Sequence, residues 1–403
     1  MNQKHLYIPR IAQNLLQEGV KDFPVCLITG ARQTGKVTLL REELKGMRYV
    51  TLDDLDTRAL ALRDPKLFFE KHPPPLIIDE IQYAPDLLSY IKIKVDERRR
   101  EMGQFVLTGS QTFQVMKGVS ESLAGRVDLF DLYPLTWSEL KGGGHGANCF
   151  DYETLIQTLR QGFYPELYSL EKTHMTRWFK GYVRTYLERD VRHIKAVMDL
   201  ASFQIFLKLL AARVGQLLNV SEVAKEVGIS SSTAKEWLSI LESTYIVYLH
   251  RPFFSNHSKR YVKSPKLYFY DTGLLCHLLG IESNDQLENS PFLGSIFENM
   301  VILEFVKHLA YSQSPLKCYF YRTQAGAEVD LILADIKPVK AYEIKFAMKL
   351  NSHMTTGLNR LKKDFPEVDL ALLSLATHFP GIPHHGNIRC LHWYEGIDSV
   401  IRS

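Results

Sequence analysis

The residues best suited to chemistry form a glycine loop near the amino terminus, in the sequence LITGARQTGKVTLL. The loop matches the pattern G-x-x-x-x-G-K and follows a short apolar run over residues 25–29. Glycines let backbone N–H groups curl around phosphate oxygens, and a lysine at a helix N-terminus adds positive charge. The alternative is a glycine turn with a solvated lysine. We predict an ATP-binding loop formed by Gly30, Ala31, Arg32, Gln33, Thr34, Gly35, Lys36, Val37 and Thr38.

A pair of acidic residues follows another apolar run in PPPLIIDEIQ. Asp79 is predicted to hold Mg²⁺ through its water shell, and Glu80 is predicted to orient or polarise the attacking water. A strand that ends in Asp-Glu is weak evidence alone, but its position after the glycine loop strengthens it. The next apolar run ends FVLTGS, so Ser110 or Thr108 is a candidate sensor of the γ-phosphate.

Two further residues bear on hydrolysis. Arg126, in SLAGR, is either a transition-state arginine, acting within its own chain or from a neighbouring subunit, or a helix-end ion pair. Val37 stands where the loop pattern requires Ser or Thr, whose hydroxyl coordinates Mg²⁺. Thr38 cannot replace it simply, because it points about 100° further around the helix. We therefore expect nucleotide to bind but to turn over slowly.

A second group of acidic residues lies in the C-terminal part. GSIFENMVILEFV places Glu298 on an amphipathic helix, AGAEVDLIL places Asp330 in a strand, and YEIKF places Glu343 and Lys345 on one face of the next strand. The set resembles the D…E-x-K core of PD-(D/E)XK nucleases. In that chemistry Asp330 and Glu343 hold Mg²⁺ or Mn²⁺, Glu298 assists, and Lys345 activates water or stabilises the developing phosphate charge. The alternative is a set of ion pairs in an inactive nuclease-like fold.

The middle of the chain reads as a helix-turn-helix followed by a β-hairpin. NVSEVAKEVGISSSTAKEWLSILE gives two helices with a turn at Gly228. Basic residues occupy a wing position in the hairpin and the places beside it: Lys259, Arg260, Lys263, Arg251 and Lys266. Such a loop could grip DNA phosphates without reading bases, or it could form an interdomain or oligomer contact.

The pattern of elements predicts an α/β protein of several domains. Apolar runs alternate with helical patterns before residue 140, as in a parallel sheet, and the glycine-rich KGGGHGAN resembles a linker. Strands return after a helix that starts near residue 290. The predicted parts are a P-loop ATPase domain (1–140), a linker and helical segment (141–215), a winged helix-turn-helix (216–285) and a restriction-endonuclease-like α/β domain (286–403).

Composition sets wider limits. A chain of 403 residues exceeds one ordinary core, and a formal net charge of +4 permits a nucleic-acid partner without arguing for one. The five cysteines are scattered without a CxxC pair, which fits a reducing compartment. No apolar stretch has the length of a signal peptide core or a membrane span, so we expect a cytoplasmic protein.

Taken together, these stretches resemble a family of prokaryotic AAA-type ATPases with a C-terminal domain of unknown function. The resemblance covers nearly the whole chain, in GARQTGK, LIIDEIQ, VLTGSQ, SLAGRV, LYPLTWSEL, YLERDVR, AARVGQLLN, SPKLYFYDTGLL, GSIFEN, AGAEVDLIL and YEIKF. It implies a P-loop ATPase joined to a winged-helix segment and a restriction-endonuclease-like domain, using ATP and Mg²⁺. Val37 departs from the family's GKT or GKS.

Overall fold

The computed structural model describes residues 7–109, 119, 122–145, 148–169, 174–186, 199–253, 264–323, 326–376 and 388–401. The chain divides into two compact units. The first contains the chain up to Leu135 together with two short later segments, Tyr164–Ser169 and Ser243–Tyr245. The second contains the remaining described residues, and each unit is considered by itself.

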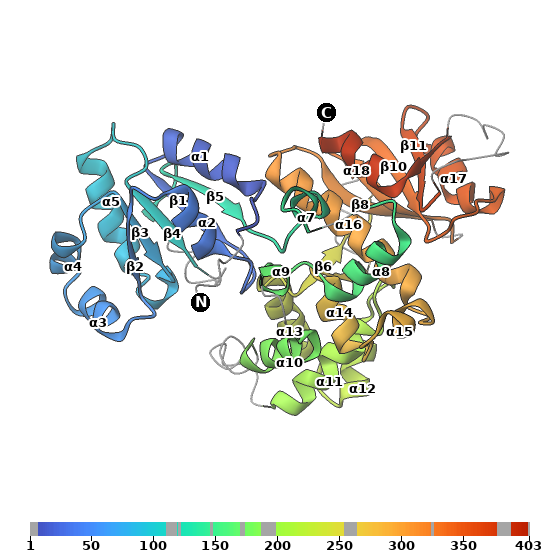
Figure 1. The fold of residues 1–403 in the computed structure, drawn as a ribbon, viewed down its shortest axis with the longest axis horizontal. Coiled ribbons are helices and arrows are strands. Elements are labelled where there is room, and N and C mark those ends of the chain that lie inside the picture. The colour runs from blue at the N-terminus through green and yellow to red at the C-terminus, as the bar shows by residue number, and fades with distance from the viewer. Residues whose placement is uncertain are drawn as a thin grey trace. The chain divides into compact units, whose positions relative to one another are not determined.

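A parallel sheet forms the centre of the first unit (Figure 1). Its strands, in the spatial order β2-β3-β4-β1-β5, are β1 (Val25–Thr29), β2 (Arg48–Thr51), β3 (Leu76–Asp79), β4 (Phe105–Thr108) and β5 (Val127–Asp131). The first four agree with the predicted apolar runs. The fifth was not predicted, because VDLFD carries two aspartates among five residues and so lacks the continuous apolar run of the other strands.

Helices cover this sheet on both faces, as Figure 1 shows for α5 and α2. The helices of the N-terminal part are α1 (Ala12–Asp22), α2 (Lys36–Glu43), α3 (Leu55–Arg63), α4 (Pro65–Lys71) and α5 (Leu87–Glu97), with a 3₁₀ turn, η1 (Ile81–Tyr83), after β3. The later segment Tyr164–Ser169 contributes the short α9 (Glu166–Ser169). Phe68, Phe69 and Ile91 pack with Leu27 and Ile78 of the strands in one buried core. Burying such side chains contributes about 1.5–3 kcal/mol each, which fixes the strands whose ends carry the predicted chemistry.

The second unit begins with helices. They are α7 (Trp137–Gly142), α8 (Tyr152–Gln161), α10 (Met175–Tyr186), α11 (Leu200–Ala211), α12 (Val220–Val227), α13 (Ser231–Ser243), α14 (Thr272–Leu278) and α15 (Asn284–Glu288). Helices α12 and α13 are separated by a turn in which Gly228 has a φ of 81°. The antiparallel strands β6 (Val247–His250) and β7 (Lys266–Phe269) follow them. The helix-turn-helix and hairpin order therefore agrees with the prediction.

A mixed sheet forms the C-terminal part of the second unit. Its strands, in the order β12-β11-β10-β9-β8, are β8 (Lys317–Arg322), β9 (Glu328–Ala334), β10 (Pro338–Ile344), β11 (Asp369–Ser374) and β12 (Ile388–His392). Strands β8, β9 and β10 are antiparallel neighbours, whereas β10, β11 and β12 run parallel. The associated helices are α16 (Leu293–Tyr311), η4 (Ser352–Thr355), α17 (Thr356–Asp364) and α18 (Trp393–Ile401).

Helix α16 differs from the amphipathic helix that we expected. Its buried residues lie all around the helix and include the charged side chains of Glu304 and Lys307, which pair at 3.6 Å. It is therefore a central helix, without the solvated face of an amphipathic one. No helix among the described residues is long and apolar enough to cross a membrane.

Helix α7, which spans the boundary predicted at residue 140, packs with the second unit. Trp137 is fully buried against Trp393, with ring centroids 5.0 Å apart, and its backbone N–H donates to Glu304 at 3.0 Å. Because these partners belong to the second unit, helix α7 belongs to it too. Most of the three segments predicted after residue 140 also belongs to that unit, apart from Tyr164–Ser169 and Ser243–Tyr245.

Candidate functional site

The glycine loop connects β1 to α2 in a backbone conformation that needs its glycines. Gly30 has a φ of 134°, and a Cβ at this position would lie 2.2 Å from the carbonyl oxygen of Leu132. Gly35, at the start of α2, has a left-handed φ of 88°. Side chains at these two positions would force the loop to change shape, so its backbone is set by local sequence.

A buried arginine that the sequence analysis missed supports the loop. Arg10 donates from Nη1 to the carbonyl of Thr34 at 2.6 Å and from Nη2 to the carbonyl of Tyr133 at 2.7 Å. The hydroxyl of Thr34 in turn donates to the carbonyl of Ala31 at 2.9 Å. These bonds tie the loop to the segment that follows β5. Arg10 lies just before the first helix, and the sequence around it contains no motif that would have indicated this role.

Lys36 lies at the loop, where the prediction places it. Its Nζ donates to the carbonyls of Gly30 at 3.0 Å and Ala31 at 2.8 Å. The ammonium group is thus held by the same loop whose N–H groups would enclose phosphate oxygens. Val37 is half-buried in the first turn of α2, and Thr38 is exposed.

Asp79 ends β3 at the same edge of the sheet and is surrounded by hydroxyl groups. Tyr49 donates to its Oδ2 at 2.8 Å, Thr51 donates to the same oxygen at 3.1 Å, and Thr108 donates to Oδ1. Burial, followed by the contact with Asp79, raises the pKa of Tyr49 to about 12, so the phenol stays a donor at neutral pH. Tyr49 and Thr51 were missed, although their i, i+2 spacing on a strand puts both on one face.

Thr108 joins the ends of β3 and β4. Its Oγ1 accepts from the backbone N–H of Glu80 at 3.1 Å, in addition to its bond with Asp79. Glu80 has a left-handed φ of 59°, and its carboxylate accepts from the amide of Gln82. Ser110, the other candidate sensor, lies outside the described residues.

These residues fit a magnesium ion held through water. The partners of the Asp79 carboxylate are neutral hydroxyls, and among the described residues no cationic side chain pairs with it. Asp79 therefore offers carboxylate oxygens, the ligand type that Mg²⁺ prefers, beside the predicted phosphate-binding loop. Asp79 would hold such an ion, which would neutralise phosphate charge when bound with nucleotide.

Arg126 does not join this group. It precedes β5 at the amino end of the sheet, where its carbonyl accepts from the N–H of Val25. Strand β1 then runs about 3.3 Å per residue to the loop at the other end. The guanidinium is paired with Asp96, at 2.9 Å from Nε and 3.2 Å from Nη2. The structure favours the ion-pair alternative within the chain, and a role toward a neighbouring subunit stays a prediction.

The C-terminal acidic residues do come together, and we call Glu298, Glu328, Asp330 and Glu343 with their two lysines the acidic centre. Lys345 Nζ lies 2.7 Å from Glu343 Oε1 and 3.3 Å from Asp330 Oδ2. The backbone N–H of Ile344 also donates to Asp330 Oδ2, at 2.9 Å. Lys345 therefore bridges the two carboxylates that were predicted to share a metal ion.

The second lysine was assigned elsewhere by sequence. Lys266 was expected beside a phosphate-gripping loop, but its side chain is only 4% exposed and lies in the acidic centre. Its Nζ is 2.5 Å from Glu328 Oε1, 3.4 Å from Glu298 Oε1 and 3.5 Å from Asp330 Oδ1. A buried ammonium cannot contact DNA phosphates, so that expectation for Lys266 is corrected. Sequence could not show which way this strand residue points.

Burial and these ion pairs set the pKa values of the carboxyl groups in the acidic centre. Burial raises the pKa of Glu298 to about 7 and that of Glu343 to about 8, and nearby Asp330 adds to both shifts. Burial also disfavours the charge on Asp330, but Lys266 and Lys345 outweigh it and hold its pKa below the ordinary value. The phenol of Tyr268 donates to Glu298 at 2.5 Å.

The acidic centre does not fit a divalent metal ion. Lys266 and Lys345 contact all four carboxylates, and Arg322 also pairs with Glu328 at 2.8 Å. Within the described parts of the chain, no group of three or more His, Cys, Asp or Glu side chains is arranged to hold a metal ion. The surroundings of Asp330 and Glu343 therefore do not support their predicted roles as metal ligands.

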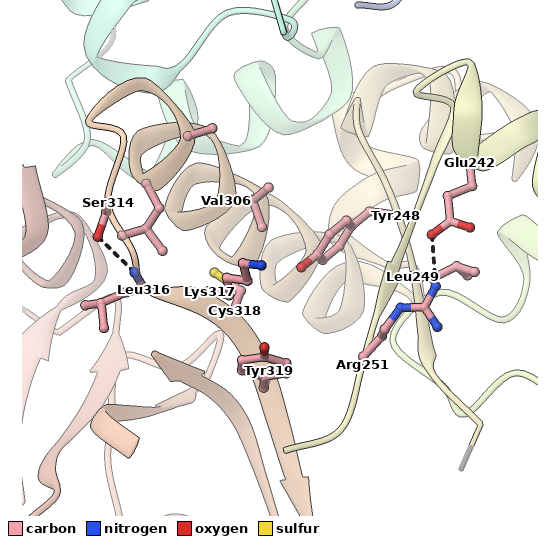
Figure 2. Close-up of a pocket in the computed structure, with 12 residues that line it drawn as sticks. Glu242, Tyr248, Leu249, Arg251, Val306, Ser314, Leu316, Lys317, Cys318 and Tyr319 are labelled. Carbon is pink, nitrogen blue, oxygen red and sulfur yellow. Dashed lines mark hydrogen bonds and ion pairs between the residues drawn. The ribbon is translucent and has the colours of Figure 1, made fainter. Parts of the chain in front are cut away.

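A cavity of about 540 Å³ lies elsewhere in the second unit, between β6, α16 and β8 (Figure 2). Tyr248 and Cys318 line it, and Arg251 at its rim pairs with Glu242 at 3.4 Å. None of the predicted catalytic or nucleotide-binding residues lines this cavity. The remaining basic residues of the predicted wing, Lys259, Arg260 and Lys263, lie outside the described residues.

Comparison with protein families divides the chain in three. Residues 22–141 match an AAA domain, residues 152–285 match a domain of unknown function (DUF8612), and residues 293–380 match a domain of unknown function (DUF4143). The AAA match and the parallel sheet confirm the predicted α/β fold class with an N-terminal P-loop domain, a helical middle and a C-terminal mixed sheet.

Relatives extend over most of the chain. An uncharacterized protein of Mycobacterium tuberculosis is 33% identical over 373 residues, which cover 92% of this chain and 80% of the relative. An uncharacterized protein of Haemophilus influenzae is 24% identical and covers 88% of this chain and 90% of its own length. Among solved structures, a Walker-type ATPase of Pyrococcus abyssi is similar over 68% of this chain and 97% of its own, with 14% identity and a TM-score of 0.45.

Proposed function

Because this chain belongs to the family of AAA-domain proteins with the C-terminal domain of unknown function DUF4143, we propose that it binds ATP with Mg²⁺ and hydrolyses it slowly. One observation carries the proposal. The glycine loop with Lys36, the carboxylate of Asp79 and the hydroxyl of Thr108 meet at one edge of one parallel sheet. Parallel strands place their carboxyl ends together, which is where ligands bind in sheets of this kind.

The roles follow from the side chains. Loop N–H groups and Lys36 would bind the phosphates, and Asp79 would hold the magnesium ion through water. Glu80 would orient the attacking water, while Thr108 fixes the backbone of Glu80 beside Asp79. Val37 offers no hydroxyl to the ion, which supports slow turnover.

The test is steady-state ATP turnover with Mg²⁺, together with binding of a fluorescent ATP analogue. We expect weak turnover and clear binding in the wild type, and loss of both in Lys36→Ala. Arg98→Ala serves as the matched control in the same unit, because its side chain is exposed and pairs with Glu101 at 3.4 Å. Wild-type binding that survives in Lys36→Ala would refute the proposed site.

A second proposal concerns DNA. It rests on helices α12 and α13 with their following hairpin, and on the exposed side chains of Ser231, Ser232 and Lys235. In this proposal the nucleotide state of the P-loop domain governs how the helix-turn-helix segment (216–285) engages duplex DNA. ATP turnover that rises with duplex DNA and falls again in high salt would support it. Turnover indifferent to DNA would favour a switch that acts on a protein partner.

A further inference from the structure

The acidic centre of the second unit contains its own cations. Lys266 reaches it from β7, Lys345 from the residue after β10, Glu298 from α16, and Glu328 and Asp330 from β9. Each lysine touches at least two carboxylates within 3.5 Å. Side chains from β7, α16, β9 and the end of β10 thus meet around two ammonium groups, as the ligands of a structural metal ion meet around the metal.

The cations of the centre nearly match its carboxylates in number. Four carboxylates face Lys266, Lys345 and Arg322, so three positive side chains already pair with the carboxylate oxygens. An added divalent ion would have to compete with these ammonium and guanidinium groups for the same oxygens.

We propose that Lys266 takes the place of a divalent metal ion in the acidic centre, so that this nuclease-like domain binds no metal and does not cleave DNA by a metal-dependent reaction. The lysine joins the β6–β7 hairpin to the C-terminal sheet through Glu328 and Asp330. A divalent ion at Glu328 and Asp330 would have to displace a buried ammonium group from two of its three carboxylate partners. The acidic centre is then a structural connection within the second unit.

The test uses nucleotide-free, chelator-treated full-length protein and Mn²⁺, whose free-ion electron paramagnetic resonance signal disappears on binding. Wild type should leave the signal unchanged, whereas Lys266→Met should gain saturable binding of one Mn²⁺ per chain. Lys337→Met is the matched control, because Lys337 lies in the same unit and, among the described residues, its ion pair is with exposed Glu367, at 3.0 Å. This variant should behave as wild type.

Three outcomes decide the inference. Saturable Mn²⁺ binding by wild type that is lost in Asp330→Asn would overturn it, and this arm needs no lysine variant to fold. Binding by neither wild type nor a Lys266→Met protein of native circular dichroism would also overturn it, since the carboxylates would then not form a cation site. As an independent readout, wild type should not nick supercoiled plasmid with Mn²⁺, and nicking abolished by Asp330→Asn would likewise contradict the inference.

Discussion

Two buried aspartates at strand positions, Asp79 and Asp330, have opposite surroundings. Asp79 accepts three hydrogen bonds from the hydroxyls of Tyr49, Thr51 and Thr108. Asp330 lies against the ammonium groups of Lys266 and Lys345 and accepts a backbone N–H. The hydroxyls donate hydrogen bonds that orient the Asp79 carboxylate, whereas the ammonium groups form ion pairs with Asp330. A short acidic motif therefore does not identify a metal site until the neighbouring side chains are known.

The lysines of the two regions differ in the same way. Lys36 is half-buried and bonds to the carbonyls of Gly30 and Ala31 in the loop that would enclose phosphate. Lys266 is almost fully buried, and burial opposes its charge, but Glu298, Asp330 and Glu328 raise its pKa above the ordinary range. Lys36 lies in the loop that would enclose phosphate, whereas Lys266 is paired with carboxylates of the chain.

The largest effect is expected from removing the Lys266 ammonium group. Lys266→Met should lower the free energy of unfolding by about 3–5 kcal/mol, because breaking a buried ion pair leaves uncompensated charge. Urea denaturation followed by tryptophan fluorescence measures this, since all four tryptophans lie in the second unit. Lys337→Met should change it by less than about 1 kcal/mol, as exposed pairs do. Equal effects of the two substitutions would contradict the conclusion that Asp330, unlike Asp79, is part of a buried ion-pair cluster.

The next largest effect, on ATP turnover, is expected from replacing the carboxylate of Asp79. Asp79→Asn preserves the size of the side chain but removes the negative charge, so ATP turnover with Mg²⁺ should fall about 100-fold, at the upper end for residues acting through a metal's outer shell. Thr51→Val should cost much less, because it removes one of three hydroxyl donors. An Asp79→Asn protein with unchanged turnover would show that the carboxylate does not serve the ion.

Much of the first site could be predicted, because its chemistry lies in contiguous residues. Gly30 to Lys36 dictate the loop through backbone geometry, and Asp79 follows directly from an apolar strand. Arg10, Tyr49 and Thr51 were missed because their contacts depend on sheet order, which short-range patterns do not encode. Strand β5, which was not predicted, leads to Tyr133, whose carbonyl accepts a hydrogen bond from Arg10.

The acidic centre shows where such prediction stops. The spacing of Glu343 and Lys345 correctly placed both on one side of a strand, where they pair at 2.7 Å. Lys266 is remote in sequence from every carboxylate it touches, and its basic neighbours in the hairpin suggested a solvent-facing role. Its burial follows from the packing of the hairpin against the C-terminal sheet, where Phe253 N–H donates to the carbonyl of Phe320.

A smaller effect is expected in the pH dependence of stability. The folded pKa of Glu343, about 8, lies above its ordinary value of 4.5, so between these values the folded state holds a proton that the unfolded state has released. Stability is therefore greatest below pH 4.5 for this group and falls as pH rises. Between pH 7 and pH 8 the free energy of unfolding should fall by about 1 kcal/mol through this group.

Glu343→Gln should remove that part of the decline, and the comparison cancels groups common to both proteins. The histidines His250 and His392, whose pKa values burial lowers to about 3 and about 4, contribute below this window. Tryptophan fluorescence during urea denaturation again reports on the second unit. Parallel pH profiles for the two proteins would mean that Glu343 is ionised in the fold.

The smallest effect is expected at Val37, where the first site lacks a hydroxyl. Valine and threonine have nearly the same shape, so Val37→Thr adds an oxygen in the first turn of α2 with little repacking. Turnover should rise about threefold, equivalent to about 0.7 kcal/mol of activation free energy. The matched control is Thr38→Val, which removes the neighbouring exposed hydroxyl and should leave turnover unchanged. A fall in Thr38→Val would instead assign the missing ligand to Thr38, and the slow turnover of the wild type would need another cause.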